Sequence, residues 1–270
     1  MKNIIIILAA IFCLLPLTWA QEVDSTAMHP TGETGVGASD MEIWDSANEA
    51  YTGGDYQKAA TLYTSLVQSG KQSAKLYYNL GNAYFKQNKL GNAILNYNRA
   101  QLLAPGDEDI AYNLAMANAR TVDKIEDVPE FFLTTWIRNI GQSFNSNAWT
   151  AFGLVFLALA LGAVILWLVS NKMSLRKTGF YGALFSAILM ITSISYAQIA
   201  RTRQLDSRHG IVMNSAAPVK SSPSASSKDI FVLHEGTKFI VNETLDGWHE
   251  ISIADGNKGW IQQSAVELIK

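Results

Sequence analysis

Cysteine is almost absent from the sequence, because Cys13 is the one cysteine among 270 residues. It lies inside an apolar N-terminal segment, and Phe12 stands directly before it, where a lipid-modified cysteine needs a small residue. We therefore interpret Cys13 as a hydrophobic residue of a secretory signal. A mature chain without this segment contains no thiol, which excludes disulfide bonds and cysteine chemistry.

The sequence also lacks an excess of charge of either sign. The formal net charge is −2, so no strong field over the whole chain attracts nucleic acid. The sequence shows no nucleophile–base pair and no metal-ligand spacing, and the glycines of GETGVG (32–37) follow no predicted strand. We therefore predict a protein that is not an enzyme, holds no cofactor or metal, and does not bind nucleic acid.

Apolar residues are abundant, at 49% of the chain against 16% charged residues, and they are concentrated in segments. In residues 1–20, a lysine precedes a long apolar run, and small residues stand at positions −3 and −1 before Gln21. This pattern predicts a signal peptide that is removed before Gln21. Residues 21–39 are polar, rich in glycine and without periodicity, which predicts a flexible leader.

A repeat with a period of about 34 residues runs through residues 40–121. Small and aromatic residues coincide when the chain is aligned with itself at this offset. The coinciding pairs include Ala47 with Gly81, Ala59 with Ala93, Tyr63 with Tyr97, Tyr78 with Tyr112 and Asn79 with Asn113. A fixed period of this length predicts pairs of helices stacked as a solenoid, with small residues where two backbones approach closely.

The best copy of this repeat resembles the tetratricopeptide repeat family. The residues that match the family pattern are Tyr77, Leu80, Gly81, Tyr84, Ala93, Tyr97, Ala100 and Pro105. The copy at residues 40–73 is weaker, with Lys71 in place of the proline, and a third start provides one helix only. Residues 40–121 are thus predicted to form two repeats and a capping helix. Because so small a stack is marginally stable alone, we expect other contacts to support it.

The resemblance implies a non-catalytic module that binds a peptide in a concave groove lined by the first helix of each pair. The predicted groove residues are Trp44, Asn48, Tyr51, Tyr78, Asn79, Asn82, Phe85, Tyr112 and Asn113. Asparagine suits this role because its amide both donates to and accepts from a peptide backbone. Trp44, Tyr112 and Met116 replace the basic residues with which chaperone-binding relatives hold a carboxylate, so we expect an uncharged groove. The alternative is that these aromatic residues only pack between helices.

Two uncharged runs, residues 149–169 and 179–200, are each long enough to cross a hydrocarbon core of roughly 30 Å. They predict a transmembrane hairpin with a cytoplasmic loop at 170–178. The basic residues on the two sides are almost equal in number, so the signal peptide decides the predicted topology. It places both ends in the periplasm and the chain in the cytoplasmic membrane. Because the runs contain no ionisable residue, we interpret the hairpin as an anchor in membrane lipid.

The linker at residues 122–148 contains apolar residues at four-residue spacing, such as Phe132, Trp136 and Ile140. This spacing predicts an amphipathic helix that starts near Pro129. Such a helix can lie on the bilayer surface or against a partner's membrane segment, or it can pack on the repeats. The sequence leaves these alternatives open.

Residues 209–270 change to the period of two that is typical of strands, with turn signals at LDGW and ADGNKGW. Gly259-Trp260-Ile261 and the strand at Trp248–Ile251 resemble the bacterial SH3-like family. The resemblance implies a small barrel that binds peptides, sometimes cell-wall peptides. Trp248 and Trp260 are its candidate binding residues, or else core residues. We expect His234 and His249 to be surface residues that bind no metal.

The whole mature chain resembles the TPR/SH3 membrane proteins of the Bacteroides aerotolerance operons, the BatE family. The predicted fold is multidomain: an all-α tetratricopeptide solenoid, a two-helix transmembrane hairpin and a C-terminal all-β SH3-like barrel. The resemblance implies a scaffold in a cell-envelope complex for aerotolerance or stress tolerance, with von Willebrand-type Bat membrane proteins as partners. The alternative is an envelope sensor or anchor that binds peptidoglycan through the SH3-like domain.

Overall fold

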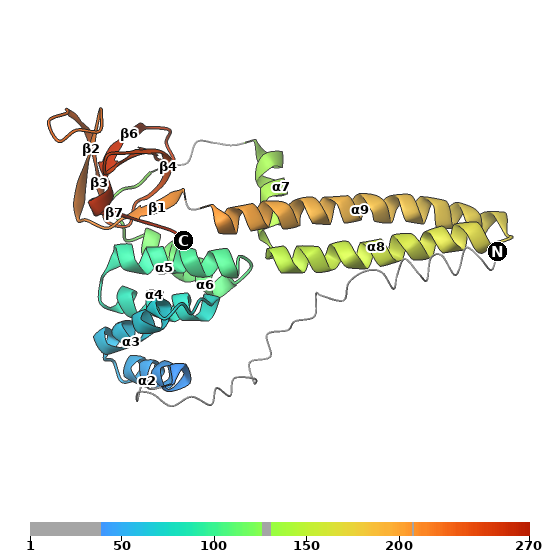
Figure 1. Ribbon diagram of the computed structural model, residues 1–270, viewed down its shortest axis with the longest axis horizontal. Coiled ribbons are helices and arrows are strands. Elements are labelled where there is room, and N and C mark those ends of the chain that lie inside the picture. Colours follow the sequence, from blue (N-terminus) through green and yellow to red (C-terminus); the bar gives the residue numbers. More distant parts are fainter. Residues whose placement is uncertain (1–38, 126–130, 207) are drawn as a thin grey trace. The chain divides into compact units, whose positions relative to one another are not determined.

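The computed structural model describes residues 39–125, 131–206 and 208–270 (Figure 1). The predicted signal peptide, and all of the predicted leader except Ser39, lie outside these described residues. The helices are α2 (Asp40–Thr52), α3 (Tyr56–Gln68), α4 (Ala74–Lys86), α5 (Leu90–Leu103), α6 (Glu108–Asn118), α7 (Phe132–Gln142), α8 (Ser146–Val169) and α9 (Met173–Leu205). The strands are β1 (His209–Val212), β2 (Ala216–Lys220), β3 (Asp229–His234), β4 (Lys238–Leu245), β5 (Trp248–Ser252), β6 (Lys258–Gln262) and β7 (Val266–Leu268).

Helices α2 to α5 form the two predicted helix pairs, and α6 is the single helix of the third unit. The small residues of the repeat lie at the helix contacts, where Ala47, Ala93 and Ala100 are fully buried. A Cβ atom on Gly81 would lie 2.7 Å from two ring carbons of Tyr97, so only glycine leaves room for this ring. The regular spacing of small residues therefore reflects close backbone approach between paired helices.

Side chains at the helix starts explain where most of these helices begin. Ser39 and Glu42 form a capping box, in which the Ser39 hydroxyl accepts from the Glu42 N–H and the Glu42 carboxylate accepts from the Ser39 N–H. The other N-cap side chains that accept first-turn N–H groups are Asp55, Ser73 and Asp107. Pro105 lies between α5 and α6, and it prevents α5 from continuing as a helix.

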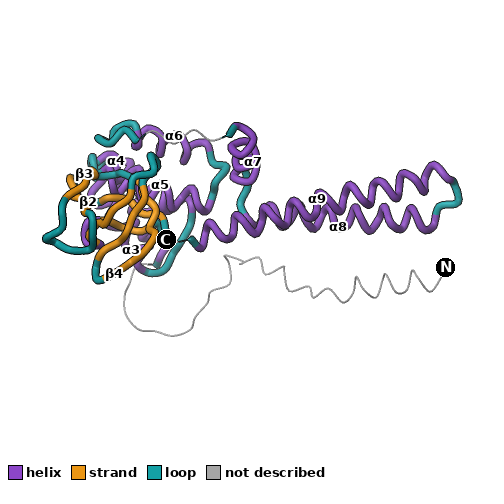
Figure 2. Tube along the Cα trace, turned by 90° about the horizontal axis from the view of Figure 1, so that it is seen from above, coloured by secondary structure: helices purple, strands orange, loops and turns teal. Residues whose placement is uncertain are grey.

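Helices α8 and α9 lie side by side over most of their length (Figures 1 and 2). Both are long and apolar enough to cross a membrane, and only 6% and 11% of their most apolar windows are buried. Such low burial differs from that of a core helix in a soluble protein. At Gly179, an added Cβ would lie 2.6 Å from the Trp167 backbone nitrogen, so small residues permit close packing here too.

The two long helices extend beyond the uncharged runs that predicted them. Helix α9 begins at Met173 and ends at Leu205, so the connection between the helices is Ser170–Lys172, which lies inside the predicted cytoplasmic loop 170–178. Lysine and arginine are good helix formers, so a helix can continue through basic residues past the end of an apolar segment. The 33 residues of α9 correspond to about 50 Å.

Aromatic residues connect helix α7 to the N-terminal end of α8 and the C-terminal part of α9. Trp149 stacks on Tyr196 at a centroid distance of 4.8 Å, and its Nε1–H donates to the Gly141 carbonyl at 3.4 Å. The Tyr196 hydroxyl donates to the Ile137 carbonyl at 3.3 Å. The apolar side chains that α7 and its start leave exposed are Phe131, Phe132, Leu133, Trp136 and Ile137. This pattern disfavours packing of that apolar face on the repeats and leaves it open to a bilayer surface or a partner.

The C-terminal strands form one antiparallel sheet with the order β3-β2-β6-β5-β4-β1-β7. Val219, Phe239, Ile251 and Ile261 are almost fully buried in its core. Edge strands β3 and β7 do not pair with each other among the described residues, so a closed SH3-like barrel is not confirmed. On the side of β7 that does not pair with β1, Arg99 of α5 donates to the Leu268 carbonyl at 3.4 Å. A helix side chain therefore occupies that edge of the sheet.

Helix α5 and the sheet share a hydrophobic core that the sequence did not reveal. Ile94 and Leu95 of α5 are buried in one cluster with Ile211 of β1 and Ile269 after β7. A hydrogen bond beside the cluster also joins α5 to the sheet, since the Gly91 N–H donates to Glu235 Oε1 at 2.8 Å. The support that a two-repeat solenoid needs therefore comes from the chain's own sheet.

Candidate functional site

The candidate site is the face formed by the first helix of each unit, α2, α4 and α6, here called the first-helix face. Trp44, Tyr78 and Tyr112 occupy equivalent positions of the three successive units on these helices. They therefore form one row of aromatic residues across the stack. Tyr112 is the most exposed of the three, since Trp44 and Tyr78 are half-buried and Tyr112 is 68% exposed.

Asparagines on this face form a repeated hydrogen-bond network with buried tyrosines of the second helices, α3 and α5. In the first copy, the Tyr63 hydroxyl donates to Asn48 Oδ1 at 2.7 Å, and Asn79 Nδ2 lies 3.4 Å from the same oxygen. In the second copy, at the equivalent positions of the next unit, Tyr97 and Asn113 donate to Asn82 Oδ1 at 2.7 and 2.9 Å. Each asparagine at the first position thus joins a tyrosine of its own pair to an asparagine of the next unit.

Both tyrosines of the network stay neutral at physiological pH. Burial is the main cause that raises the pKa of Tyr63, and the Asn79 hydrogen bond opposes it. Burial also raises the pKa of Tyr97 strongly, with the nearby Tyr78 hydroxyl as the next cause. The hydroxyls therefore keep the protons that they donate to Asn48 and Asn82.

The network uses part of the hydrogen-bonding capacity of the four asparagines and leaves the remainder available to a ligand. Asn48 and Asn82 accept through Oδ1, whereas Asn79 and Asn113 donate through Nδ2. In the described parts of the chain, the opposite amide atoms of these side chains have no hydrogen-bond partner, and the residues are half-buried. An extended peptide backbone offers both a donor and an acceptor to such a row.

Three of the predicted groove residues mainly pack between helices. Trp44 makes an edge-to-face contact with Tyr63 at 5.6 Å, and Tyr51 makes one with Tyr56 at 5.3 Å. Phe85 packs against the core that α5 shares with the sheet. The packing alternative therefore accounts for much of the aromatic character here, and Tyr112 is the predicted aromatic residue that is most open to a partner.

The first-helix face also carries cations that the sequence interpretation missed. The Lys75 ammonium lies 5.7 Å from the ring centre of Trp44, and the Arg120 guanidinium lies 4.4 Å from that of Phe85. The expectation of an uncharged groove did not include these two cations, which lie beside aromatic rings of the predicted groove. Helical spacing could have indicated Lys75, which precedes Tyr78 by one turn of α4.

In the sheet, the two candidate tryptophans differ. Trp248 is only 8% exposed, which leaves little of its ring for a ligand, whereas Trp260 on β6 is half-buried. His249 is also 8% exposed, and its Nδ1 lies 2.8 Å from the Thr244 hydroxyl, so it is not the surface residue we expected. The alternating pattern placed His249 correctly in a strand but could not show that its polar ring has a buried partner.

One His–carboxylate pair has a structural role. Asp123 accepts hydrogen bonds from Thr237 Oγ1 and from the His234 backbone N–H, and it lies 2.7 Å from His234 Nδ1. Burial alone would raise the pKa of Asp123, but these bonds from Thr237 and His234 lower it overall. Because the hydroxyl donates to the carboxylate and not to the imidazole, the group is no nucleophile–base relay. Within the described ranges, no three His, Cys, Asp or Glu side chains gather as a metal site.

Comparison with known families supports the repeat at the centre of this face. A tetratricopeptide repeat family model matches residues 74–107, which comprise α4, α5 and the turn after them. No curated protein matches the chain. Repeats of this class are typically non-catalytic and mediate protein–protein interactions, which agrees with a face built from amide and aromatic groups.

Proposed function

We propose that this protein is a membrane-anchored, non-catalytic adaptor that binds an extended segment of a partner protein on the first-helix face. The observation that supports this most strongly is the row of half-buried asparagines with unpaired amide atoms beside the exposed Tyr112. The amides can pair with the backbone of any extended segment, whereas Tyr112 can anchor one side chain of it. The fixed core between α5 and the sheet favours a single rigid adaptor body over two independent modules.

The two apolar helices serve as the anchor in this proposal. Because two crossings return the chain to its starting side, α2–α6 and the sheet lie on the same side of the membrane, which we propose to be the periplasm. The order of segments, together with the resemblance to BatE-type proteins, supports a place in a cell-envelope complex of the aerotolerance kind. Von Willebrand-type membrane proteins are the proposed partners.

Replacing Tyr112 with alanine tests the proposed binding face. Loss of a central interface aromatic residue costs about 2 kcal/mol, which corresponds to roughly 30-fold weaker binding. We therefore expect Tyr112→Ala to reduce the partner protein that co-purifies with the full chain from detergent-solubilised membranes by at least tenfold. Because Tyr112 is 68% exposed, the fold is expected to remain intact.

Thr61→Ala provides the matched control, since Thr61 is exposed on α3, a second helix of a pair. This variant should retain the partner at the wild-type level, as measured by quantitative mass spectrometry of the eluates. Equal retention by the Tyr112 and Thr61 variants would show that the partner binds elsewhere.

A further inference from the structure

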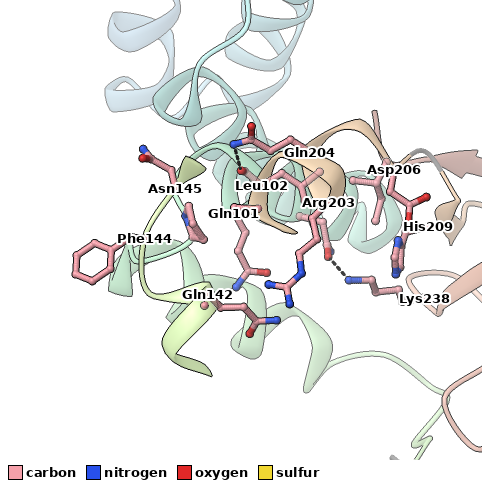
Figure 3. A pocket seen from close by; sticks show the side chains of 15 residues that line it. Gln101, Leu102, Gln142, Phe144, Asn145, Arg203, Gln204, Asp206, His209 and Lys238 are labelled. Atoms are coloured by element: carbon pink, nitrogen blue, oxygen red, sulfur yellow. Dashed lines mark hydrogen bonds between the residues drawn. The ribbon is translucent and has the colours of Figure 1, made fainter. Parts of the chain in front are cut away.

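A cavity of about 280 Å³ lies where α5, the α7–α8 junction, α9 and the sheet meet, and both polar and apolar side chains line it (Figure 3). Arg203 enters it from the end of α9 and Lys238 from β4, while Gln101 and Gln142 add amide groups. In Figure 3, the guanidinium of Arg203 lies close to the amide of Gln142. The cavity therefore gathers hydrogen-bond donors from four parts of the chain that are distant in sequence.

The charge balance of the cavity is positive. Its lining includes one carboxylate, Asp206, which accepts two bonds of 2.8 Å from the Arg208 guanidinium. These bonds lower the pKa of Asp206 to about 2, so it stays ionised and bound to Arg208. Lys238 donates to the neutral Asn98 Oδ1 at 2.9 Å, so this bond does not neutralise its charge. An anion would relieve this imbalance.

Burial lowers the pKa values of two basic residues that line the cavity, Lys238 and His209. Burial is the largest cause for both, and for the pKa of His209 the charge of Lys238 is the next cause. The charge of Asp206 raises the pKa of His209, but burial and Lys238 outweigh it, and no carboxylate offsets the effect of burial on Lys238.

The position of the cavity along α9 selects among possible anions. Arg203 follows the end of the uncharged run at Ala200 by three residues, or about 5 Å along a helix. The polar headgroup layer of a bilayer extends roughly 5–8 Å beyond its hydrocarbon core. Phe144 borders the cavity and contacts Phe152, in the predicted first span, at 5.3 Å between ring centres. Its exposed ring offers an apolar path from the cavity toward the acyl layer.

From this geometry we propose that the cavity binds the phosphodiester headgroup of an anionic phospholipid, with Arg203 and Lys238 as its phosphate ligands. The acyl chains would follow Phe144 and Phe152 along α8. Such a lipid would connect the hairpin, α7 and the base of the adaptor body, and would fix that body relative to the bilayer. The inference rests on the membrane anchoring in the proposed function.

The test uses the full chain in detergent, with phosphatidylglycerol, phosphatidylcholine of the same acyl chains, or inorganic phosphate as probes. Native mass spectrometry and the shift of the thermal unfolding midpoint report binding. We expect phosphatidylglycerol to bind at least tenfold more tightly than phosphatidylcholine, and inorganic phosphate to bind weakly. Arg203→Gln and, separately, Lys238→Gln should each weaken phosphatidylglycerol binding about tenfold, because each removes one charge-assisted bond.

Arg201→Gln removes the same charge two residues away, at an exposed position of α9, and should leave phosphatidylglycerol binding unchanged. Equal binding of the two lipids, or equal losses in the Arg201 and Arg203 variants, would overturn the proposal. Inorganic phosphate that binds as tightly as phosphatidylglycerol would also overturn it, because the site would then recognise a free anion. Vesicle flotation separates the two hypotheses: a chain that does not float contradicts the anchor, whereas one that floats without lipid preference contradicts the headgroup site alone.

Discussion

Replacing Ile211 with alanine is expected to lower the free energy of unfolding by about 2–5 kcal/mol and to loosen helix α5 together with the sheet. Ile211 belongs to β1, yet it is fully buried in the cluster that contains Ile94 and Leu95 of α5. The substitution leaves a cavity on the side of α5. If the solenoid and the sheet are one cooperative unit, both lose stability by the same amount.

Hydrogen exchange read by mass spectrometry measures this effect segment by segment. In the Ile211 variant, protection should fall in α5 and in β1–β4 alike. Ile230→Ala is the matched control, because Ile230 is 52% exposed on β3. The same substitution at this surface position should change the free energy of unfolding by only about 0.5 kcal/mol or less. Loss of protection confined to the sheet, with α5 unchanged, would mean that the two parts fold independently.

Replacing Gly81 with valine is expected to destabilise the solenoid by about 1–3 kcal/mol. A Cβ at this position lies 2.7 Å from the Tyr97 ring, and that ring is 1% exposed. The ring cannot swing away freely because its hydroxyl donates to Asn82 at 2.7 Å. Overpacking of this kind costs about 1–3 kcal/mol, and the slightly better helix propensity of valine offsets only a few tenths.

A double-mutant cycle with Tyr97→Ala identifies the clash as the cause. Removal of the ring creates room for the valine methyl groups, so the double variant should be more stable than the sum of the two single effects by about 1–3 kcal/mol. Gly162→Val is the control on α8, where an added Cβ meets no atom within 4 Å. Additive effects of the two substitutions, measured by denaturant unfolding, would exclude the proposed contact.

The structural features that repeat along the chain could be predicted from the sequence. The repeat period predicted the helix pairs and the glycine contact at Gly81, because a repeat places local helix packing at fixed positions. It could also have revealed the hydrogen-bond network, since the asparagine and tyrosine positions of its first copy recur in the second. The lengths of the uncharged runs predicted two helices, although charged residues are a poor guide to where a helix ends.

Contacts between distant segments were not predictable. Ile94 and Ile211 are each an ordinary apolar residue of its own element, and no sequence spacing relates α5 to β1. The cavity at Arg203 depends on four such segments at once. The edge at β7 is a similar case, because β7 pairs with β1 on one side and meets Arg99 of α5 on the other.

Photo-crosslinking in intact cells tests the central claim, that the first-helix face binds a partner, most directly. A photoreactive amino acid in place of Tyr112 should link the chain to one discrete protein partner. The same group in place of Thr61, on the exposed side of α3, should give no such product. Crosslinks of equal yield from both positions, or a partner captured from Thr61 alone, would contradict a binding site on the first-helix face.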